Sequence, residues 1–305
     1  MASDRAKAAG GDVSARIEAA LLKALGGPDA RLCGRGFQTP PKLIQAMQYA
    51  VFPGGARVRP RLALAVARAC GEDRPDLTDA AACALEFLHC ASLAHDDLPC
   101  FDDAAMRRGR PSVHAAFGEA AAVLVGDGLI VLAFQTLAEA GARSPDRLPA
   151  LLMTVSDAVG VPGGIVAGQA WESEEKVDLS AYQRSKTGAL FVAAAVAGAE
   201  SAGADPAPWR RFGDLLGEAY QVADDIHDQV ASRPDLGKPI GRDGVLGRPN
   251  AVGVLGLDGA VRRLKSLVSD CIGSIPRCSG EEALRSLIEQ QASRFLPKSL
   301  LERIA

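Results

Sequence analysis

Apolar residues recur at intervals of three and four through most of this chain, the spacing that places them on one face of a helix. Glycine, proline and short polar runs separate these segments and predict the connecting loops. We find no convincing two-residue alternation and no fixed-period repeat, so the pattern predicts one all-α domain over residues 1–305, with a flexible N-terminus at 1–12. Helices are predicted over residues 13–25, 40–49, 57–70, 78–96, 119–140, 148–159, 165–171, 181–202, 208–230, 257–272 and 280–295.

The predicted helix over residues 78–96 leads into the most strongly charged window of the chain. Thr78 is its expected N-cap, and Asp79 lies favourably in its first turn. Pro99 is expected to perturb the helix inside the charged window. The predicted helix over 208–230 likewise ends in acidic residues, so two helices share this organisation.

Composition narrows the class of protein. Hydrophobic residues make up 48% of the chain and aromatic residues 5%, which suits closely packed helices with small side chains. A formal net charge of −3 gives no general basic field for nucleic acid or anionic lipid. The N-terminus has no apolar signal-peptide core, and the longest apolar runs, residues 120–134 and 189–199, are too short to span a bilayer. We expect a cytoplasmic protein without stable membrane insertion, whose seven cysteines are free thiols.

Charged groups of both signs crowd into residues 92–114. The aspartates are Asp96, Asp97, Asp102 and Asp103. So many carboxylates repel one another unless a cation neutralises them, and their hard oxygens suit Mg²⁺, which is often held by carboxylates together with substrate phosphates. Arg107 and Arg108 follow and are suited to bidentate phosphate contacts. Asp96 and Asp102 are six residues apart, so the backbone between them must bulge if both are to reach one ion.

A second acidic cluster lies near the end of the predicted helix over 208–230. Asp224, Asp225 and Asp228 are three and four residues apart and can share one helix face. One such cluster is more typical of a solvated face or a helix cap than of a metal site. Two clusters, each next to an apolar helix, favour a metal-bound diphosphate in a central cavity between two Asp-rich helices.

Several weaker signals accompany the two acidic clusters. Gly54 and Gly55 form a turn ahead of arginines that enter a helix, an arrangement suited to holding a diphosphate. The remaining candidates are polar residues near the predicted acidic faces, each of them weak alone because such residues are usually solvated or belong to the core. They are His89, Lys186, Thr187, Gln221 and Lys238.

Together these motifs resemble the trans-prenyl diphosphate synthases along the whole chain. The matching stretches are GGARVRP, HDDLPCFDD with the following RRG, Gly168-Gln169, KTG, and YQVADDIHD with LGKP. The chain is most similar to bacterial geranylgeranyl diphosphate synthases of carotenoid and bacteriochlorophyll pathways, through FPGGARVRPRL, HCASLAHDDLPCFDD, AGQAWESEEKVDL and GRPNAV. The resemblance implies an isoprenoid-synthase helical bundle, head-to-tail condensation of isopentenyl diphosphate with an allylic diphosphate, and a homodimer.

The resemblance also implies roles for individual residues. A trinuclear Mg²⁺ cluster, which Mn²⁺ can replace, would be held by Asp96, Asp102 and Asp224, with Asp97, Asp103, Asp225 and Asp228 as ligands or their supports. The allylic diphosphate would contact Arg107, Lys186 and Lys238. Isopentenyl diphosphate would contact Gly55, Arg57, His89 and Arg108. Thr187 and Gln221 would face the allylic cation.

The chain departs from the family pattern at two places, and two other classes of protein stay open. Ala56 stands where the family usually has lysine, and residues 248–250 replace the usual lysine and threonine pattern. A class I terpene cyclase would also ionise an allylic diphosphate, but it carries a mixed second motif rather than an aspartate-rich one. A catalytically silent partner subunit is favoured by Ala56 alone, since both acidic motifs are intact.

The helix that leads into Asp96 bears on product length. At 1.5 Å per residue, Ala91 lies roughly 7.5 Å below Asp96, and Phe87 roughly 13 Å below it. Ala91 and Ser92 are small, so a farnesyl tail can pass them, and the Phe87 ring is the expected floor. This arrangement favours twenty-carbon geranylgeranyl diphosphate, with fifteen-carbon farnesyl diphosphate as the alternative product.

Overall fold

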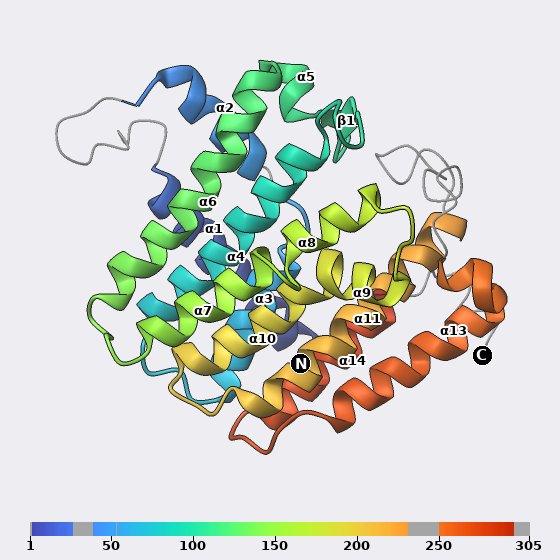
Figure 1. Cartoon of the computed structure of the whole chain (residues 1–305). Helices are drawn as coiled ribbons and strands as arrows, with labels where there is room; N and C mark the ends of the chain where they lie inside the picture. Colours follow the sequence, from blue (N-terminus) through green and yellow to red (C-terminus); the bar gives the residue numbers. More distant parts are fainter. Residues whose placement is uncertain (1, 27–38, 53, 231–249, 296–305) are drawn as a thin grey trace.

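Most of the chain is helical, as the spacing of apolar residues predicted (Figure 1). The computed structural model describes residues 2–26, 39–52, 54–230 and 250–295. The helices are α1 (Ala2–Leu25), α2 (Pro41–Val51), α3 (Val58–Ala69), α4 (Pro75–Asp96), α5 (Val113–Phe117), α6 (Glu119–Gly141), α7 (Leu148–Val159), α8 (Ile165–Ala170), the short 3₁₀ turn η1 (Trp171–Ser173), α9 (Leu179–Gln183), the π-helical turn η2 (Arg184–Gly188), α10 (Ala189–Ser201), α11 (Ala207–Val230), α13 (Ala251–Gly273) and α14 (Glu281–Phe295).

Helices α4 and α10 form the centre of the main hydrophobic core. Both are apolar on nearly every side, as expected of helices surrounded by other helices. Small residues bring their neighbours close: a Cβ at Gly198 would lie 2.5 Å from the carbonyl oxygen of Ala63 in α3. Because α10 packs against both α4 and α11, it lies between the two helices that carry the acidic clusters.

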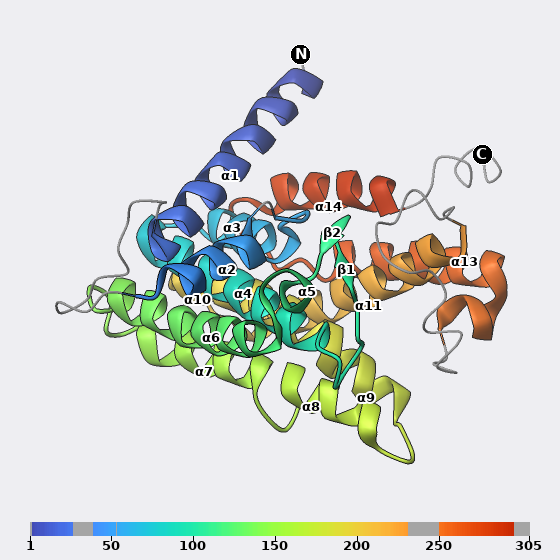
Figure 2. The ribbon, with the colours of Figure 1, turned by 90° about the horizontal axis from the view of Figure 1, so that it is seen from above.

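The N-terminal boundaries differ from expectation in two places. Helix α1 begins at Ala2, ahead of the predicted start at residue 13, and its N-terminal half extends away from the other helices (Figure 2). Alanine, lysine and arginine are strong helix formers, which accounts for this extension. The prediction of Thr78 as an N-cap is wrong. Helix α4 begins at Pro75, a residue well suited to a first turn, and the Thr78 hydroxyl lies 3.1 Å from that of Ser201 inside the bundle.

One predicted helix is interrupted in the structure. The segment predicted as one helix over 181–202 consists of α9, the wider π-helical turn η2 and α10. The apolar spacing continues through η2, so the spacing alone did not predict this interruption. Helix α13 begins at Ala251 but breaks at Gly256, which has a positive φ (68°), so the part after the break agrees with the helix predicted over 257–272.

A small hairpin follows the first acidic cluster. Strands β1 (Met106–Arg107) and β2 (Arg110–Pro111) pair antiparallel, and the two residues between them, Arg108 and Gly109, both have positive φ. This is the backbone geometry of a two-residue hairpin turn. No strand was predicted here. The turn is functionally relevant because it places the Arg108 side chain next to the glycine turn ahead of α3.

Helices α4 and α6 are long and apolar enough to cross a membrane, judged by length and composition alone. The apolar run in α6 was expected to be too short, but the helix continues beyond it on both sides. In α4, 78% of the most apolar window is buried inside the bundle, as in the core helix of a globular protein. In α6 only 39% is buried, so this helix presents an exposed apolar face.

Candidate active site

The first acidic cluster lies at the end of α4, where the chain leaves the helix in a tight loop. The amide of Asp102 donates to the carbonyl of Asp96 (2.9 Å), and the amide of Ala104 donates to the carbonyl of Asp97 (3.1 Å). These bonds fold the intervening residues outward and return Asp102 to the level of Asp96. The loop therefore has the bulge that a shared ion would require. Asp103 is exposed and has a left-handed backbone (φ 45°).

Three carboxylates meet at this loop. Asp96, Asp102 and Glu172 each offer an oxygen within 4.8 Å of the others. Glu172 comes from η1 and was not predicted as a site residue from the sequence. The available signal was its place three residues after Gln169 within the AGQAWESEEKVDL stretch. Hard oxygen donors converging from separate elements suit Mg²⁺ or Mn²⁺, so the donor set fits the metal that the sequence implied.

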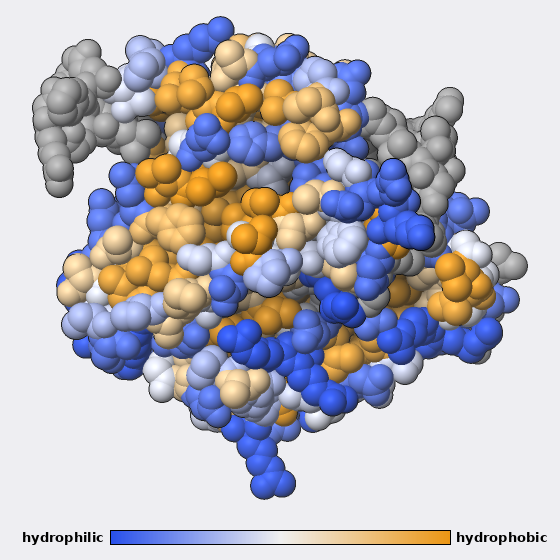
Figure 3. Space-filling view, viewed as in Figure 1, coloured by the Kyte–Doolittle hydropathy of each residue, from blue (hydrophilic) through white to orange (hydrophobic). Residues whose placement is uncertain are grey.

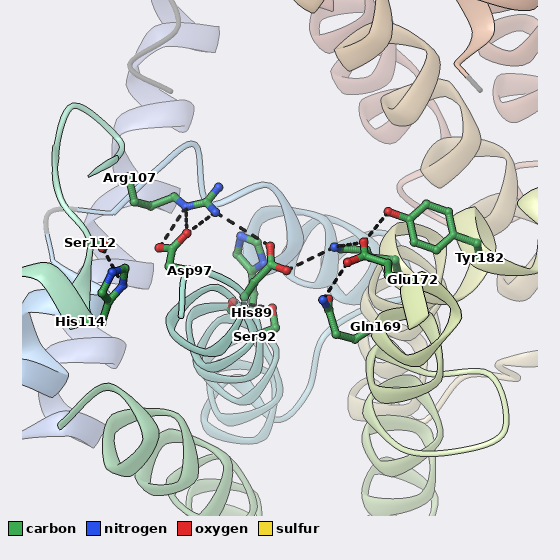
Figure 4. Close-up of polar contacts among 11 residues, drawn as sticks. His89, Ser92, Asp97, Arg107, Ser112, His114, Gln169, Glu172 and Tyr182 are labelled. Carbon is green, nitrogen blue, oxygen red and sulfur yellow. Dashed lines mark hydrogen bonds and ion pairs between the residues drawn. The ribbon is translucent and has the colours of Figure 1, made fainter. Parts of the chain in front are cut away.

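Glu172 lies beside Gln169 and Tyr182 (Figure 4), and Lys186 connects it with Asp96. Its Nζ donates to Oε1 of Glu172 (2.5 Å) and to Oδ1 of Asp96 (3.3 Å). The hydroxyl of Tyr182 and the amide of Gln169 also donate to Glu172, at 2.8 and 2.9 Å. The π-helical turn η2 thus places Lys186 between carboxylates that come from two different parts of the chain.

Asp97 and Arg107 form a buried pair beside the three carboxylates. Asp97 is 2% exposed, and the guanidinium of Arg107 donates to it through Nε and Nη2. Burial raises the pKa of Asp97, although Arg107 opposes the shift. Burial by itself lowers the pKa of Arg107, but the contacts with Asp97 reverse this and raise it. The geometry gives Asp97 the task of orienting Arg107, which also lies 3.9 Å from Asp96.

A cationic pocket lies about two turns further down α4. It is centred on His89 of α4, on which the charges of Arg59 from α3 and Arg108 from the hairpin turn act most strongly and those of Arg107 and Arg57 less strongly. The Nε of Arg59 is buried and has no hydrogen-bond partner among the described residues, and its guanidinium lies over the ring of Phe191 (5.1 Å). Burial and the surrounding arginines lower the pKa of His89 well below its ordinary value. A buried donor without a partner among several cations is suited to receive an anion.

Gly55 and Arg57, both predicted to hold isopentenyl diphosphate, lie in different surroundings. Gly55 is exposed, and a Cβ there would lie 3.1 Å from Nε of Arg108, so the glycine leaves room for that guanidinium. Arg57 is 6% exposed and is bound by Glu18 and Glu86. Arg57 is thus held by two carboxylates, whereas the charge of Arg59 acts more strongly on His89 than that of Arg57 does.

The second acidic cluster occupies the last turns of α11. Asp225 is 8% exposed and accepts hydrogen bonds from the Gln221 amide (3.0 Å) and from the backbone N–H of Ala251 (2.7 Å). Gln221 in turn accepts from the Thr187 hydroxyl (2.9 Å). This chain of bonds fixes the end of α11 against η2 and the start of α13.

For several predicted site residues the structure gives a position but does not test the proposed role, which stays a prediction. Asp224 and Asp228 lie on α11 and are half-buried, while Lys238 lies outside the described residues. Phe87 and Ala91 are fully buried in the core, and the Ser92 hydroxyl donates to the carbonyl of His89 (2.9 Å). The central cavity between the Asp-rich helices also stays a prediction. A groove of about 1560 Å³ that the structure does show lies elsewhere, between α1, α2, α4 and α6.

The all-helical bundle is the fold that the resemblance to the prenyl synthases implied. The family model for polyprenyl synthetases matches residues 40–290, and the chain belongs to this family. It is 51% identical to the geranylgeranyl diphosphate synthase of Cereibacter sphaeroides, over 95% of this chain and 98% of that protein. It is 50% identical to the geranylgeranyl diphosphate synthase of Rhodobacter capsulatus, over 92% and 95% of the two chains.

Solved structures show the same fold. The geranyltransferase of Helicobacter pylori, complexed with magnesium and isoprenyl diphosphate, superposes with a TM-score of 0.78 at 27% identity. The match covers 93% of this chain and 97% of that one. The resemblance inferred from the motifs is thereby confirmed at the level of the family and of the helical fold.

Proposed function

We propose that this protein condenses isopentenyl diphosphate with an allylic diphosphate, head to tail, and that its product is geranylgeranyl diphosphate. The observation that carries the proposal is the pairing of two sites along α4. Asp96, Asp102 and Glu172 form an acidic set suited to a metal-bound diphosphate, and Arg59, His89 and Arg108 form a cationic pocket suited to a second diphosphate. A condensation of two diphosphates needs two such sites.

Mg²⁺ bound by Asp96, Asp102 and Glu172, together with Asp224 of the second cluster, would neutralise the leaving diphosphate. We propose a trinuclear arrangement, as in the resemblance described above. The remaining catalysis falls to the chain's own residues, which hold the substrates in line and exclude water. Lys186 and Arg107 are close enough to Asp96 to contact the allylic diphosphate.

The scheme assigns the other residues by position. Arg59, Arg108 and a protonatable His89 hold isopentenyl diphosphate, and the exposed Gly55 lets Arg108 approach. Thr187 and Gln221 present oxygens near the site where allylic positive charge develops. No described side chain is positioned as an evident base for the final proton loss, which we therefore assign to the departing diphosphate.

The twenty-carbon product is supported by the two curated relatives at 50–51% identity, both named geranylgeranyl diphosphate synthase. A farnesyl diphosphate synthase of Geobacillus stearothermophilus is 40% identical over 74% of this chain, so the fifteen-carbon alternative has weaker support. The carotenoid and bacteriochlorophyll context inferred from the motifs is part of this proposal.

We also propose a cytoplasmic homodimer formed through α6 and α7. Exposed apolar residues gather on these helices and on α8, where Figure 3 shows a broad hydrophobic surface. They are Val123, Leu124, Val131, Met153 and Val166. Such an extended apolar face is typical of a protein–protein interface. The six cysteines of the described residues are free thiols, consistent with a reducing compartment.

The test is product formation. Purified protein would be incubated with Mg²⁺, labelled isopentenyl diphosphate and dimethylallyl, geranyl or farnesyl diphosphate in turn, and the products separated by chain length. We expect geranylgeranyl diphosphate, with Asp96→Ala lowering turnover by orders of magnitude while the fold is retained. A cyclic hydrocarbon would identify a terpene cyclase. Absence of product from every starter would identify a silent partner subunit.

A further inference from the structure

We propose that Arg57 is a positioning residue, which holds the glycine turn and neutralises Glu86 so that the arginines of the cationic pocket stay available to diphosphate. The inference rests on the proposed function. It assigns to Arg57 a task that involves no contact with substrate, in contrast to the role expected from the sequence.

The contacts of Arg57 join three helices. Its Nη1 donates to Oε1 of Glu86 on α4 (2.6 Å), and its Nε donates to Oε1 of Glu18 on α1 (2.8 Å). Its Nη2 donates to the carbonyl of Val51, the last residue of α2 (2.8 Å). The guanidinium thus has partners on every side and is 6% exposed. A diphosphate could reach it only by displacing Glu86 or Glu18.

Arg57 also fixes the turn that precedes α3. It has a left-handed backbone (φ 50°), and its side chain folds back over Gly54, where a Cβ would lie 1.9 Å from the guanidinium carbon. On the other side of the turn, Gly55 lies against Arg108. The two glycines are therefore held between two guanidinium groups, one buried and one facing the cationic pocket.

The ion pair between Arg57 and Glu86 matters because the Glu86 carboxylate is buried close to the cationic pocket. Glu86 is 2% exposed and lies one helical turn from His89 on α4. Burial lowers the pKa of Arg59, and Glu86 acts in the opposite direction, so the Glu86 charge also acts on Arg59. A buried carboxylate without its partner is strongly unfavourable. Without Arg57, Glu86 would attract Arg59 and withdraw that guanidinium from the anion.

A double-mutant cycle tests this directly. The variants are Arg57→Met, Glu86→Gln and the two combined, with kcat and the KM for each substrate measured separately. We expect Arg57→Met to raise the KM for isopentenyl diphosphate by about tenfold or more, with little change for the allylic substrate. Glu86→Gln in that background should restore most of the loss, because the unpaired carboxylate is removed. If Arg57 instead contacts the diphosphate, the double variant will bind no better than Arg57→Met.

Two controls keep the result interpretable. Arg16→Met removes comparable ion pairs of α1, with Asp79 in the first turns of α4 and with Glu72 just before that helix, and should leave the KM for isopentenyl diphosphate unchanged. Arg57→Lys retains the charge, so its KM for isopentenyl diphosphate should lie between those of the wild type and Arg57→Met. It replaces Arg57→Met in the cycle if the methionine variant does not fold. If the wild-type protein forms no prenyl product, the proposed function is wrong, but the positioning role of Arg57 can still be tested. The same cycle is then measured as isopentenyl diphosphate binding by calorimetry, where absence of rescue overturns the role of Arg57.

Discussion

Glu172 brings a third carboxylate to the first acidic loop from a different part of the chain. Replacing Glu172 with glutamine retains the size of the side chain and one acceptor oxygen but removes its charge and the second oxygen. We expect kcat to fall by about a hundredfold and the Mg²⁺ concentration for half-maximal activity to rise. Titration of activity with Mg²⁺, together with metal binding by calorimetry, measures both. Glu174→Gln, an exposed neighbour two residues away, is the matched control. An unchanged Mg²⁺ requirement in Glu172→Gln would remove Glu172 from the metal site.

His89 should take up a proton when diphosphate binds. Burial and the nearby Arg59 and Arg108 hold its pKa well below the ordinary value, so the ring is neutral near neutral pH. A bound anion offsets those positive charges and raises the pKa of His89. Binding is therefore coupled to proton uptake at pH values between the pKa of His89 in the free protein and its pKa in the complex. The affinity for isopentenyl diphosphate falls as pH rises through that interval.

Calorimetric titration of isopentenyl diphosphate in buffers of different ionisation enthalpy measures this uptake. The diphosphate itself also titrates, so the His89 contribution is the difference between wild type and His89→Gln. Equal proton uptake by the two proteins would show that His89 does not sense the bound anion.

For individual residues, the sequence predicted the kind of chemistry at the site better than it predicted which side chains contact one another. Its two aspartate clusters and the arginines after them were evident because charge so dense requires a cation. Which arginine of Arg57 and Arg59 faces the pocket was not evident. The answer depends on a left-handed backbone at Arg57 and on Glu18 and Glu86, which are distant in sequence. Glu172 was not predicted because it meets Asp96 and Asp102, which are distant from it in sequence, only in the folded structure.

Helix α4 should determine product length. Ala91 is 1% exposed and Phe87 is fully buried, so both lie in the packed interior that a prenyl tail would enter. Ala91→Phe should shift the product to farnesyl diphosphate and destabilise the fold by about 1–3 kcal/mol through overpacking. Phe87→Ala should give chains longer than twenty carbons, because it removes the proposed floor.

Chromatography of dephosphorylated products checks both variants, and thermal unfolding checks their stability. Ala84→Phe is the control, since Ala84 lies on the same face of α4 beyond Phe87 and should leave the twenty-carbon product unchanged. Farnesyl diphosphate as the wild-type end product would place the floor above Ala91, on another helix.

Element boundaries were predictable where composition marks them. The predicted helix over 148–159 agrees with α7 at both ends, and the helix ends at Gly160, as its glycine predicted. The π-helical turn η2 was not predictable, because apolar spacing continues through it. It depends on a tertiary contact: Gly168 of α8 lies so close to η2 that a Cβ there would be 2.5 Å from the backbone nitrogen of Lys186.

Charged substitutions on the apolar face of α6 should convert the proposed dimer into a monomer. Leu124 and Val131 are 55% and 56% exposed. Leu124→Glu with Val131→Glu should give a monomer, because two charges would be buried at the dimer interface. Analytical ultracentrifugation of the wild type and variant measures this. Val254→Glu, at a residue 69% exposed on α13, is the control and should remain dimeric. A monomeric wild-type protein would contradict the proposed dimer.

For the molecule as a whole, the apolar spacing was sufficient to predict an all-α bundle, because helix formation and burial of one face follow from local pattern. It was not sufficient to predict which faces remain exposed. The run in α6 looked like any other core helix in the sequence, and only the packing of α2, α4 and α7 around it shows which residues stay uncovered.

Lys186 already satisfies two carboxylates of the acidic set, Asp96 and Glu172. A divalent ion arriving alone must compete with this internal ammonium group for the same oxygens. A diphosphate that arrives with the ion offers Lys186 new oxygens in exchange. Metal and substrate should therefore bind cooperatively, each increasing the affinity for the other by the same factor. An enzyme built this way would discriminate against free Mg²⁺ and select the ion together with its substrate.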